Sequence, residues 1–263
     1  MRGKQPSGIM TQKKMLKAAV GMFLEKGYEK TTTAEIARAA GMTPSSFFRA
    51  YESKEAILLE LVKQMFDGQF AEAERLISFT EKPEPLFMYA LETAIQLHIV
   101  ELSEPLRDLY ISAYSLPSTT EYIYKRMTKK LAAIFAAYLP QAREKDFFEL
   151  EIASGSITRG FMSVKCDVYF TMELKLRRYL DCCLKLYDVP ENVRNAVIEK
   201  ALAMDIRSIA ESIIAETVRR AESYSIPDGS EPRIAGVSPI GTPCIDTRSD
   251  PTSSTYASME VSQ

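Results

Sequence analysis

The sequence has few of the residues on which most enzyme and metal sites depend. Its 263 residues include a single histidine, His98, and only four cysteines. No Glu-x-x-His pattern, paired-carboxylate spacing, glycine-rich phosphate loop or nucleophile elbow occurs along the chain. We therefore expect no catalytic residues, no metal site and no cofactor.

The cysteines and the apolar runs exclude two further classes of protein. The cysteines have neither the spacing of a zinc site nor the density of a disulfide scaffold; they are Cys166, Cys182, Cys183 and Cys244. No apolar run approaches the roughly 20 residues that a membrane-spanning helix needs, and the N-terminus lacks the apolar core of a signal peptide. These features predict a cytoplasmic protein with reduced thiols and no membrane partner.

Strand signals are also scarce, whereas helix signals recur along the chain. After residue 52 there is no strand-like alternation, no hairpin turn dipeptide and no repeat with a period of 20–50 residues. Apolar spacing, prolines and caps instead predict an all-α fold. The expected helices of this part cover residues 53–79, then three that begin at Pro83-Glu84-Pro85, Glu104-Pro105 and Pro117-Ser118, then 143–168, 172–189 and 190–224.

The composition changes near the C-terminus. Pro, Gly, Ser and Thr supply 19 of the 38 residues from 226 to 263. Such a segment buries too little apolar surface to order itself, so we predict a disordered tail over residues 225–263. The preceding chain is expected to form two domains, residues 1–52 and 53–224.

The first domain carries the pattern of a helix-turn-helix. Thr32 and Glu35 are spaced as a capping box, which predicts the start of one helix. Gly41 stands where that helix must end in a conformation with positive φ. Thr43 and Pro44 then predict the N-cap and first residue of a second helix, which runs to about Tyr51. The conjunction of these signals favours a DNA-binding motif over a plain corner between two helices.

The second helix of the motif has the composition of a DNA reader. Phe47 is expected to face the first helix, whereas Ser45, Ser46 and Arg49 are expected to point outwards. Small hydroxyl residues and one arginine at the exposed start of a short helix suit the major groove of DNA.

At this point the sequence resembles the TetR family of bacterial transcriptional regulators. The resemblance rests on Thr-Thr-Thr-Ala-Glu-Ile-Ala (31–37), Ala-Gly-Met-Thr (40–43), Phe-Phe-Arg-Ala-Tyr (47–51) and Ser-Lys-Glu (53–55). The end of the preceding helix, Phe-Leu-Glu-Lys-Gly-Tyr (23–28), matches as well. The match covers about the first quarter of the chain, and it implies a DNA-binding regulator that acts as a repressor.

Two residues depart from the family pattern. Phe48 stands where a tyrosine hydroxyl usually touches a phosphate, so we expect it to press on a thymine methyl instead. Arg49 replaces a common histidine and adds a fork of donors suited to guanine or phosphate. The alternative is that Phe48 packs on the first helix and Arg49 is merely solvated. Including the phosphate contact that the resemblance implies for Lys54, the predicted DNA-binding residues are Thr33, Thr43, Ser45, Ser46, Phe48, Arg49 and Lys54.

The distribution of charge supports this prediction. Residues 1–63 carry 11 Lys and Arg against 6 Asp and Glu, whereas the whole chain carries 33 against 35. A basic first domain on an acidic remainder is what phosphate neutralisation requires, although inert domains also show modest basic excesses.

The middle of the chain is rich in tyrosine and methionine. Buried tyrosines need hydrogen-bond partners, and an apolar interior with a few polar groups is typical of ligand pockets. Most of these residues are expected to be core, but the resemblance implies an effector cavity in this region. The predicted effector-binding residues are Tyr89, His98, Tyr110, Tyr114, Tyr124, Met127 and Phe161.

The resemblance also implies a homodimer. Two C-terminal helices are expected to pair across a two-fold axis, so that the dimer spans a palindromic operator in double-stranded DNA. Residues 143–168 or 172–189, together with 190–224, are the candidates, and Ile213 is an expected interface residue. The small residues at 153–156 allow close approach between helices, either between subunits or within one.

Three functions remain open at the level of sequence. The first is a dimeric repressor released from its operator by a small apolar or amphipathic effector. The second is a DNA-binding protein controlled by a protein partner, which the acidic body and the tail suit equally well. The third and weakest is a helical enzyme centred on His98.

Overall fold

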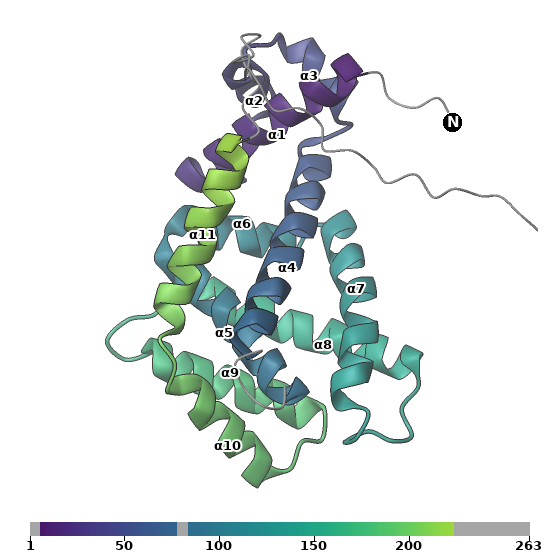
Figure 1. Ribbon diagram of the computed structural model, residues 1–263, viewed down its shortest axis with the longest axis vertical. Helices are drawn as coiled ribbons and strands as arrows, with labels where there is room; N and C mark the ends of the chain where they lie inside the picture. Colours follow the sequence, from purple (N-terminus) through teal and green to yellow (C-terminus); the bar gives the residue numbers. More distant parts are fainter. Residues whose placement is uncertain (1–5, 78–83, 224–263) are drawn as a thin grey trace, which may run out of the picture. The chain divides into compact units, whose positions relative to one another are not determined.

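A computed structural model describes residues 6–77 and 84–223, and within these ranges every regular element is an α-helix (Figure 1). The all-α prediction is confirmed. The helices are α1 (Pro6–Lys26), α2 (Thr33–Ala39), α3 (Pro44–Ala50), α4 (Lys54–Ile77), α5 (Pro85–Leu102), α6 (Glu104–Ala113), α7 (Pro117–Phe135), α8 (Glu144–Ser163), α9 (Met172–Leu186), α10 (Glu191–Leu202) and α11 (Ile206–Ser223). We call α1–α3 the head and α5–α11 the body; α4 leads from one to the other.

The helix starts lie where local sequence signals predict them. Proline occupies the first turn of α3, α5, α6 and α7, where its fixed φ suits the helix and its missing N–H costs nothing. The hydroxyl of Ser103 accepts from the N–H of Leu106 and caps α6. Ser53 does the same for Ala56 at the start of α4. Local chemistry therefore sets the starts of these helices.

The helix predicted over 143–168 is shorter in the structure. α8 ends at Ser163, and the chain then loops back towards α9. Within this loop the Asp167 carboxylate accepts the N–H groups of Tyr169 at 2.8 Å and Phe170 at 2.7 Å. An aspartate that bonds the backbone just ahead of it favours a turn over a helix, so the predicted end at Val168 is wrong.

The helix predicted over 190–224 is two helices. α10 ends at Leu202, and α11 begins at Ile206 after a break of three residues. The Asp205 carboxylate accepts the N–H of Ser208 at 3.2 Å and its hydroxyl at 2.6 Å, as a residue at a helix start does. Neither glycine nor proline marks this break, and the prediction of one continuous helix is therefore wrong.

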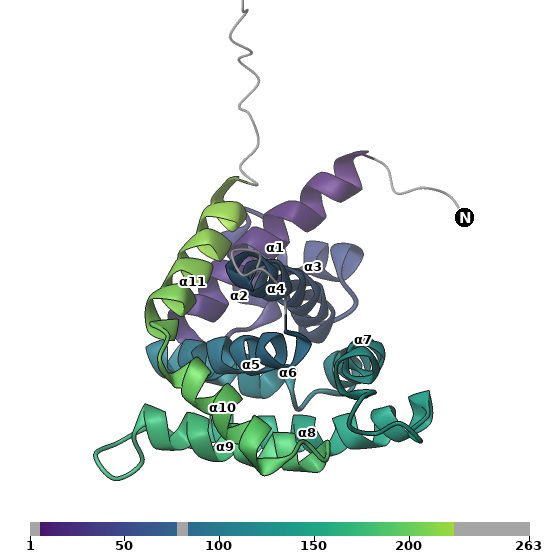
Figure 2. The ribbon, with the colours of Figure 1, turned by 60° about the horizontal axis from the view of Figure 1, so that its bottom comes forward.

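Helix α5 is the centre of the body. Nearly all of its residues are buried, and it contacts α4 and every other helix of the body. Figure 2 shows α5 between α4 and the layer formed by α8 and α9. Helix α11 lies along α5 and continues to α1 of the head (Figure 1). A helix that is apolar on all sides needs this complete cover.

The head meets the body through α6. The Asp108 carboxylate of α6 accepts the N–H of Glu29, in the turn after α1, at 3.0 Å. Gly27 has φ +89°, and a Cβ added there would lie 2.5 Å from the Asp108 Oδ2 atom. Only glycine permits both this conformation and this close approach.

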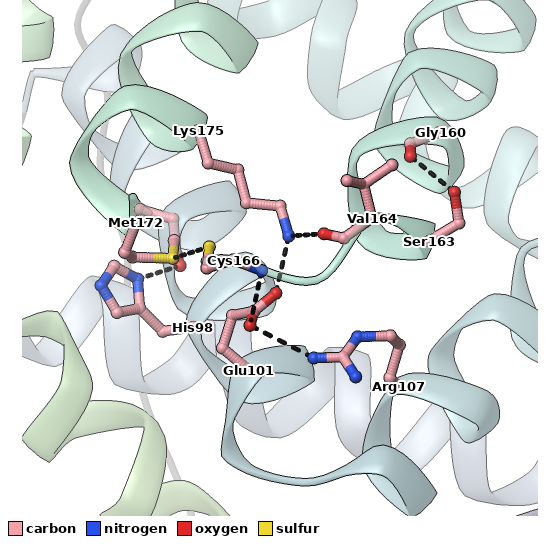
Figure 3. Close-up of polar contacts among 10 residues, drawn as sticks. His98, Glu101, Arg107, Gly160, Ser163, Val164, Cys166, Met172 and Lys175 are labelled. Atoms are coloured by element: carbon pink, nitrogen blue, oxygen red, sulfur yellow. Dashed lines mark hydrogen bonds and ion pairs between the residues drawn. The ribbon is translucent and has the colours of Figure 1, made fainter. Parts of the chain in front are cut away.

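A buried ion pair holds α9 and the α8–α9 loop to the end of α5 (Figure 3). The fully buried Lys175 ammonium lies 2.7 Å from the Glu101 carboxylate and also donates to the Val164 carbonyl. Arg107 of α6 reaches the same carboxylate at 3.2 Å. Burial acts to raise the pKa of Glu101, but the hydrogen bonds from Lys175 and the Cys166 N–H, with the two cations, hold it below its ordinary value.

The described residues all belong to one compact unit of the chain. The boundary predicted between residues 52 and 53 stays a prediction, because head and body share contacts through α1, α4 and α6. Among the described helices none combines the length and apolarity required to cross a bilayer. The tail predicted over 225–263 lies outside the described residues.

Candidate nucleic-acid interface

The start of α2 is fixed by the predicted capping box. The Thr32 hydroxyl accepts the Glu35 N–H at 3.2 Å, and the Glu35 carboxylate accepts the Thr32 N–H at 2.9 Å. Lys26 of α1 lies 2.7 Å from the same carboxylate. The hydrogen bonds from Lys26 and Thr32 lower the pKa of Glu35 to about 2. The box therefore joins the first two helices of the head as well as capping one.

The turn between α2 and α3 also follows the sequence prediction. Gly41 has φ +72° and donates to the Arg38 carbonyl, while Met42 donates to the Ala37 carbonyl, both at 2.9 Å. These bonds close the end of α2 as a Schellman-type turn does. Thr43 is the N-cap residue of α3, as predicted, but its side chain makes no capping bond.

Helix α3 is anchored by its inner face and by its end. Phe47 is fully buried beneath the helix. Gln12 of α1 donates to the Ala50 carbonyl at 2.7 Å, and the Tyr51 hydroxyl donates to Glu60 of α4 at 2.7 Å. Burial, with this bond to Glu60, raises the pKa of Tyr51 far above its ordinary value. Helix α3 is therefore fixed to both α1 and α4, with its outer face left exposed.

The outer face of α3 presents the predicted reader residues to solvent. Ser45 and Arg49 are exposed, and Phe48 is 64% exposed. The Thr43 hydroxyl lies 3.0 Å from that of Ser45 and 2.9 Å from that of Ser46. Arg49 donates to the Ser46 hydroxyl at 3.0 Å. The residues predicted at 43, 45, 46, 48 and 49 are therefore brought together on one surface.

Phe48 is exposed, so the alternative in which its ring is buried against the first helix of the motif is wrong. The ring is 64% exposed and makes a T-shaped contact with Phe47, with ring centroids 5.4 Å apart. An exposed phenyl beside a guanidinium suits a groove that offers methyl groups and acceptors. Thr33, at the first position of α2, is half-buried.

Lys54 has a different environment from the one predicted. Its ammonium donates to the carbonyls of Tyr28 and Thr31 at 2.8 and 2.9 Å and lies 4.0 Å from the centre of the Tyr28 ring. Burial lowers its pKa, although nearby carboxylates oppose the shift. In this geometry Lys54 fastens the α1–α2 loop, so its phosphate contact stays a prediction without geometric support.

The predicted effector residues lie in the body, and two of them line separate clefts. Tyr89, Tyr110 and Met127 are buried, and the Tyr114 hydroxyl donates to Gln96 at 2.8 Å. Tyr124 is half-buried and packs over Gly155. His98 and Phe161 line two separate clefts of the body.

Sequence reasoning missed a buried polar group in the same interior. The Ser154 hydroxyl lies 2.8 Å from the Glu151 carboxylate and 2.9 Å from the Tyr187 hydroxyl. Burial raises the pKa of Glu151 to about 8, against the hydrogen bond from Ser154 and with the support of Glu92. The heptad-like position of Glu151 on the inner side of α8 is the only signal that the sequence offers for its burial.

Residues 15–61 match the family model of "Bacterial regulatory proteins, tetR family". The chain is 29% identical over 149 residues to the uncharacterized HTH-type transcriptional regulator YdgC of Bacillus subtilis, covering 55% of this chain and 72% of YdgC. It is 34% identical over 88 residues to the HTH-type transcriptional repressor KstR2 of Mycobacterium tuberculosis, covering 32% of this chain and 44% of KstR2. Both relatives are named as HTH-type transcriptional regulators or repressors.

A solved structure shares the fold. FadR of Thermus thermophilus, a TetR family transcriptional repressor crystallised with lauroyl-CoA, aligns with a TM-score of 0.51 at 21% identity, over 68% of this chain and 96% of FadR. The match over the head identifies residues 15–61 as a DNA-binding domain of the tetR family of bacterial regulatory proteins, and the chain is similar to HTH-type transcriptional regulators.

Proposed function

We propose that this regulator is a homodimeric repressor that binds a palindromic operator through α3 and leaves it when a small apolar or amphipathic effector binds the body. The observation that carries the proposal is the outer face of α3. Phe48 and Arg49 project from a helix whose inner side is anchored by the fully buried Phe47. A rigid, basic and partly apolar helix face is what the major groove selects.

Arg49 is the proposed source of base discrimination. Its bond to the Ser46 hydroxyl, at 3.0 Å, holds the side chain along the outer face of α3. A guanidinium fork matches the O6 and N7 atoms of guanine, whereas the neighbouring serines can position the helix on phosphates. Phe48 supplies apolar contact to a thymine methyl beside it.

The proposed dimer interface is the outer face of α8 with the α8–α9 loop. Phe148 is 38% and Ile152 is 40% exposed on α8, and Val164, Val168 and Tyr169 of the loop are exposed more strongly. Apolar side chains gathered on one face of a soluble protein mark an interaction surface. Ser156 and Gly160 continue the same face and permit close helix approach.

Helix α11 suits this role less well than the sequence suggests. Its apolar side packs within the subunit, against α5 and α1, and Ile213 is half-buried against the core. We therefore propose that the two-fold axis passes by α8 and the α8–α9 loop, and not by the last helix of the described chain.

Effector release is proposed to act through α6 and α4. The interior tyrosines and Glu151 lie among the helices α5, α7, α8 and α9. From there α6 reaches the head through the bond between Asp108 and the Glu29 N–H, and α4 reaches it directly. An effector shifts the operator-bound state only if it binds the other state more tightly.

The test is selection of operator DNA from a random duplex library, followed by DNase I footprinting of the enriched sequences. We expect inverted half-sites whose centres are about 10–10.5 base pairs, or a multiple of that, apart. Lauroyl-CoA, found in the FadR complex, is the first compound to add to the footprint. Enrichment of no sequence, or of a single unpaired half-site, contradicts the proposed dimeric repressor.

A further inference from the structure

A second cleft lies apart from the tyrosine-rich interior. It has a volume of about 440 Å³ and forms where α9 faces the break between α10 and α11, with one residue of α5 at its base. This volume falls within the range of about 300–1,000 Å³ that is usual for small-molecule sites. The lining residues used below are His98, Met172, Leu176, Arg177, Met204 and Ile206.

The imidazole of His98 has a defined polarity in this cleft. Its Nδ1 atom lies 2.8 Å from the Ala94 carbonyl, which can only accept a hydrogen bond. Nδ1 therefore carries the hydrogen, and in the neutral ring Nε2 is an acceptor. Burial lowers the pKa of His98, although the Ala94 carbonyl opposes the shift, so the ring is neutral at pH 7. Figure 3 shows the ring beside Met172.

The rest of the cleft is an apolar floor with a charged rim. Leu176 and Ile206 are almost fully buried, and the flexible thioethers of Met172 and Met204 line the same space. At the rim the Arg177 guanidinium is paired with Glu199 and with Glu173. One cation and two carboxylates leave the rim with a net negative charge, which disfavours an anion, and the apolar floor suits an uncharged guest.

We propose that this cleft binds an uncharged, mainly apolar small molecule whose hydroxyl group donates to His98 Nε2. The floor takes the hydrocarbon part, and the hydroxyl meets Nε2, the acceptor atom of the neutral imidazole that lines the cleft. The two methionines adapt to the shape of the guest. This site is distinct from the DNA-reading face and from the interior tyrosines of the proposed effector region.

The position of the cleft gives it a path to the head. Ile206 is both a wall of the cleft and the first residue of α11. Helix α11 runs from this point along α5 to α1, against which α2 and α3 pack (Figure 1). A guest that displaces the α10–α11 junction moves α11 against α1. This regulatory consequence rests on the proposed function, whereas binding to the cleft does not.

The experiment uses the full-length protein labelled with ¹³C at methionine methyl groups. Met172 and Met204 report on the cleft, and Met127 and Met162 report on the interior of the body. The probes are 1-decanol, geraniol and 4-octylphenol, and 1-methoxydecane is the matched compound that cannot donate. We expect saturable shifts of Met172 and Met204 with at least one alcohol, and binding of 1-methoxydecane about tenfold weaker than that of 1-decanol.

Two variants complete the test. His98→Phe keeps a ring and removes the acceptor, so it should weaken alcohol binding about tenfold and leave the ether unaffected. Ala203→Trp, at an exposed rim position, should block both compounds without a change in the core. Shifts confined to Met127 and Met162, no saturable shift with any of the three alcohols, or equal affinities for alcohol and ether overturn the proposal. Because no DNA is present, failure of the operator experiment leaves this result intact.

Discussion

At the scale of single residues, Arg49 is the most direct test of the reader. We expect Arg49→Ala to lower the free energy of specific operator binding by about 1–3 kcal/mol, because a bidentate base contact is lost. The measurement is titration of selected and scrambled duplexes at several salt concentrations. Arg49→Lys is the matched variant: it keeps the charge and loses the fork, so its non-specific affinity should persist while discrimination falls. Unchanged operator affinity in Arg49→Ala would contradict the proposal that α3 lies in the major groove.

Glu151 yields a second prediction, on stability against pH. Its pKa is raised from 4.5 to about 8 in the folded protein, chiefly by burial. Between these values the unfolded chain releases a proton that the folded protein keeps, so the free energy of unfolding falls as the pH rises through this range. Glu151→Gln should remove this loss and stabilise the protein on the order of 1–3 kcal/mol at pH 8, with little effect at pH 4.5.

Urea denaturation at pH 4.5, 6 and 8 measures this effect. The control is Glu149→Gln, which neutralises an exposed carboxylate on the same helix and should leave the slope against pH as it is in the parent protein. Equal pH slopes in the parent and in Glu151→Gln count against a protonated carboxyl at the centre of the body.

At the scale of elements, the face of α8 carries the prediction about assembly. Ile152→Asp places a charge at the centre of the proposed interface and should convert dimers to monomers, since an unpaired charge in an apolar interface costs several kcal/mol. Ile213→Asp on α11 should instead lower the melting temperature and leave dimers, because Ile213 packs against its own subunit. Sedimentation velocity at micromolar concentration separates the two. Dissociation by Ile213→Asp alone, with Ile152→Asp still dimeric, moves the interface to α11.

The elements also show why some boundaries could be predicted and others could not. The capping box of Thr32 and Glu35, the positive φ of Gly41 and the prolines in four first turns are local, so their sequence signals survive in any fold. The α10–α11 break depends on Asp205, which caps a helix only because the chain turns there. In the sequence, an aspartate that caps a helix cannot be told from one that is merely exposed on a polar stretch of helix.

At the scale of the whole molecule, the contacts between distant residues were beyond sequence reasoning. Lys175 and Glu101 are 74 positions apart, and nothing in either neighbourhood predicts that a lysine lies fully buried. Lys54 shows the same limit: the resemblance implies a phosphate contact, yet the structure turns its ammonium towards the α1–α2 loop. Contacts that tertiary packing creates can be identified only from coordinates. The exposed face of α3, in contrast, could be predicted from helix periodicity alone.

The contact between Gly27 and Asp108 has a consequence for genetics. The carboxylate of α6 lies where a methyl group on residue 27 would collide with it. Gly27→Ala and Asp108→Ala should therefore disrupt the same contact between the head and α6. Both alleles should give the same phenotype: expression of the target no longer responds to inducer, although the protein accumulates normally. A reporter strain that carries each allele, and then both together, reveals this as non-additive epistasis. Additive defects in the double mutant mean that the two alleles act on separate steps of induction.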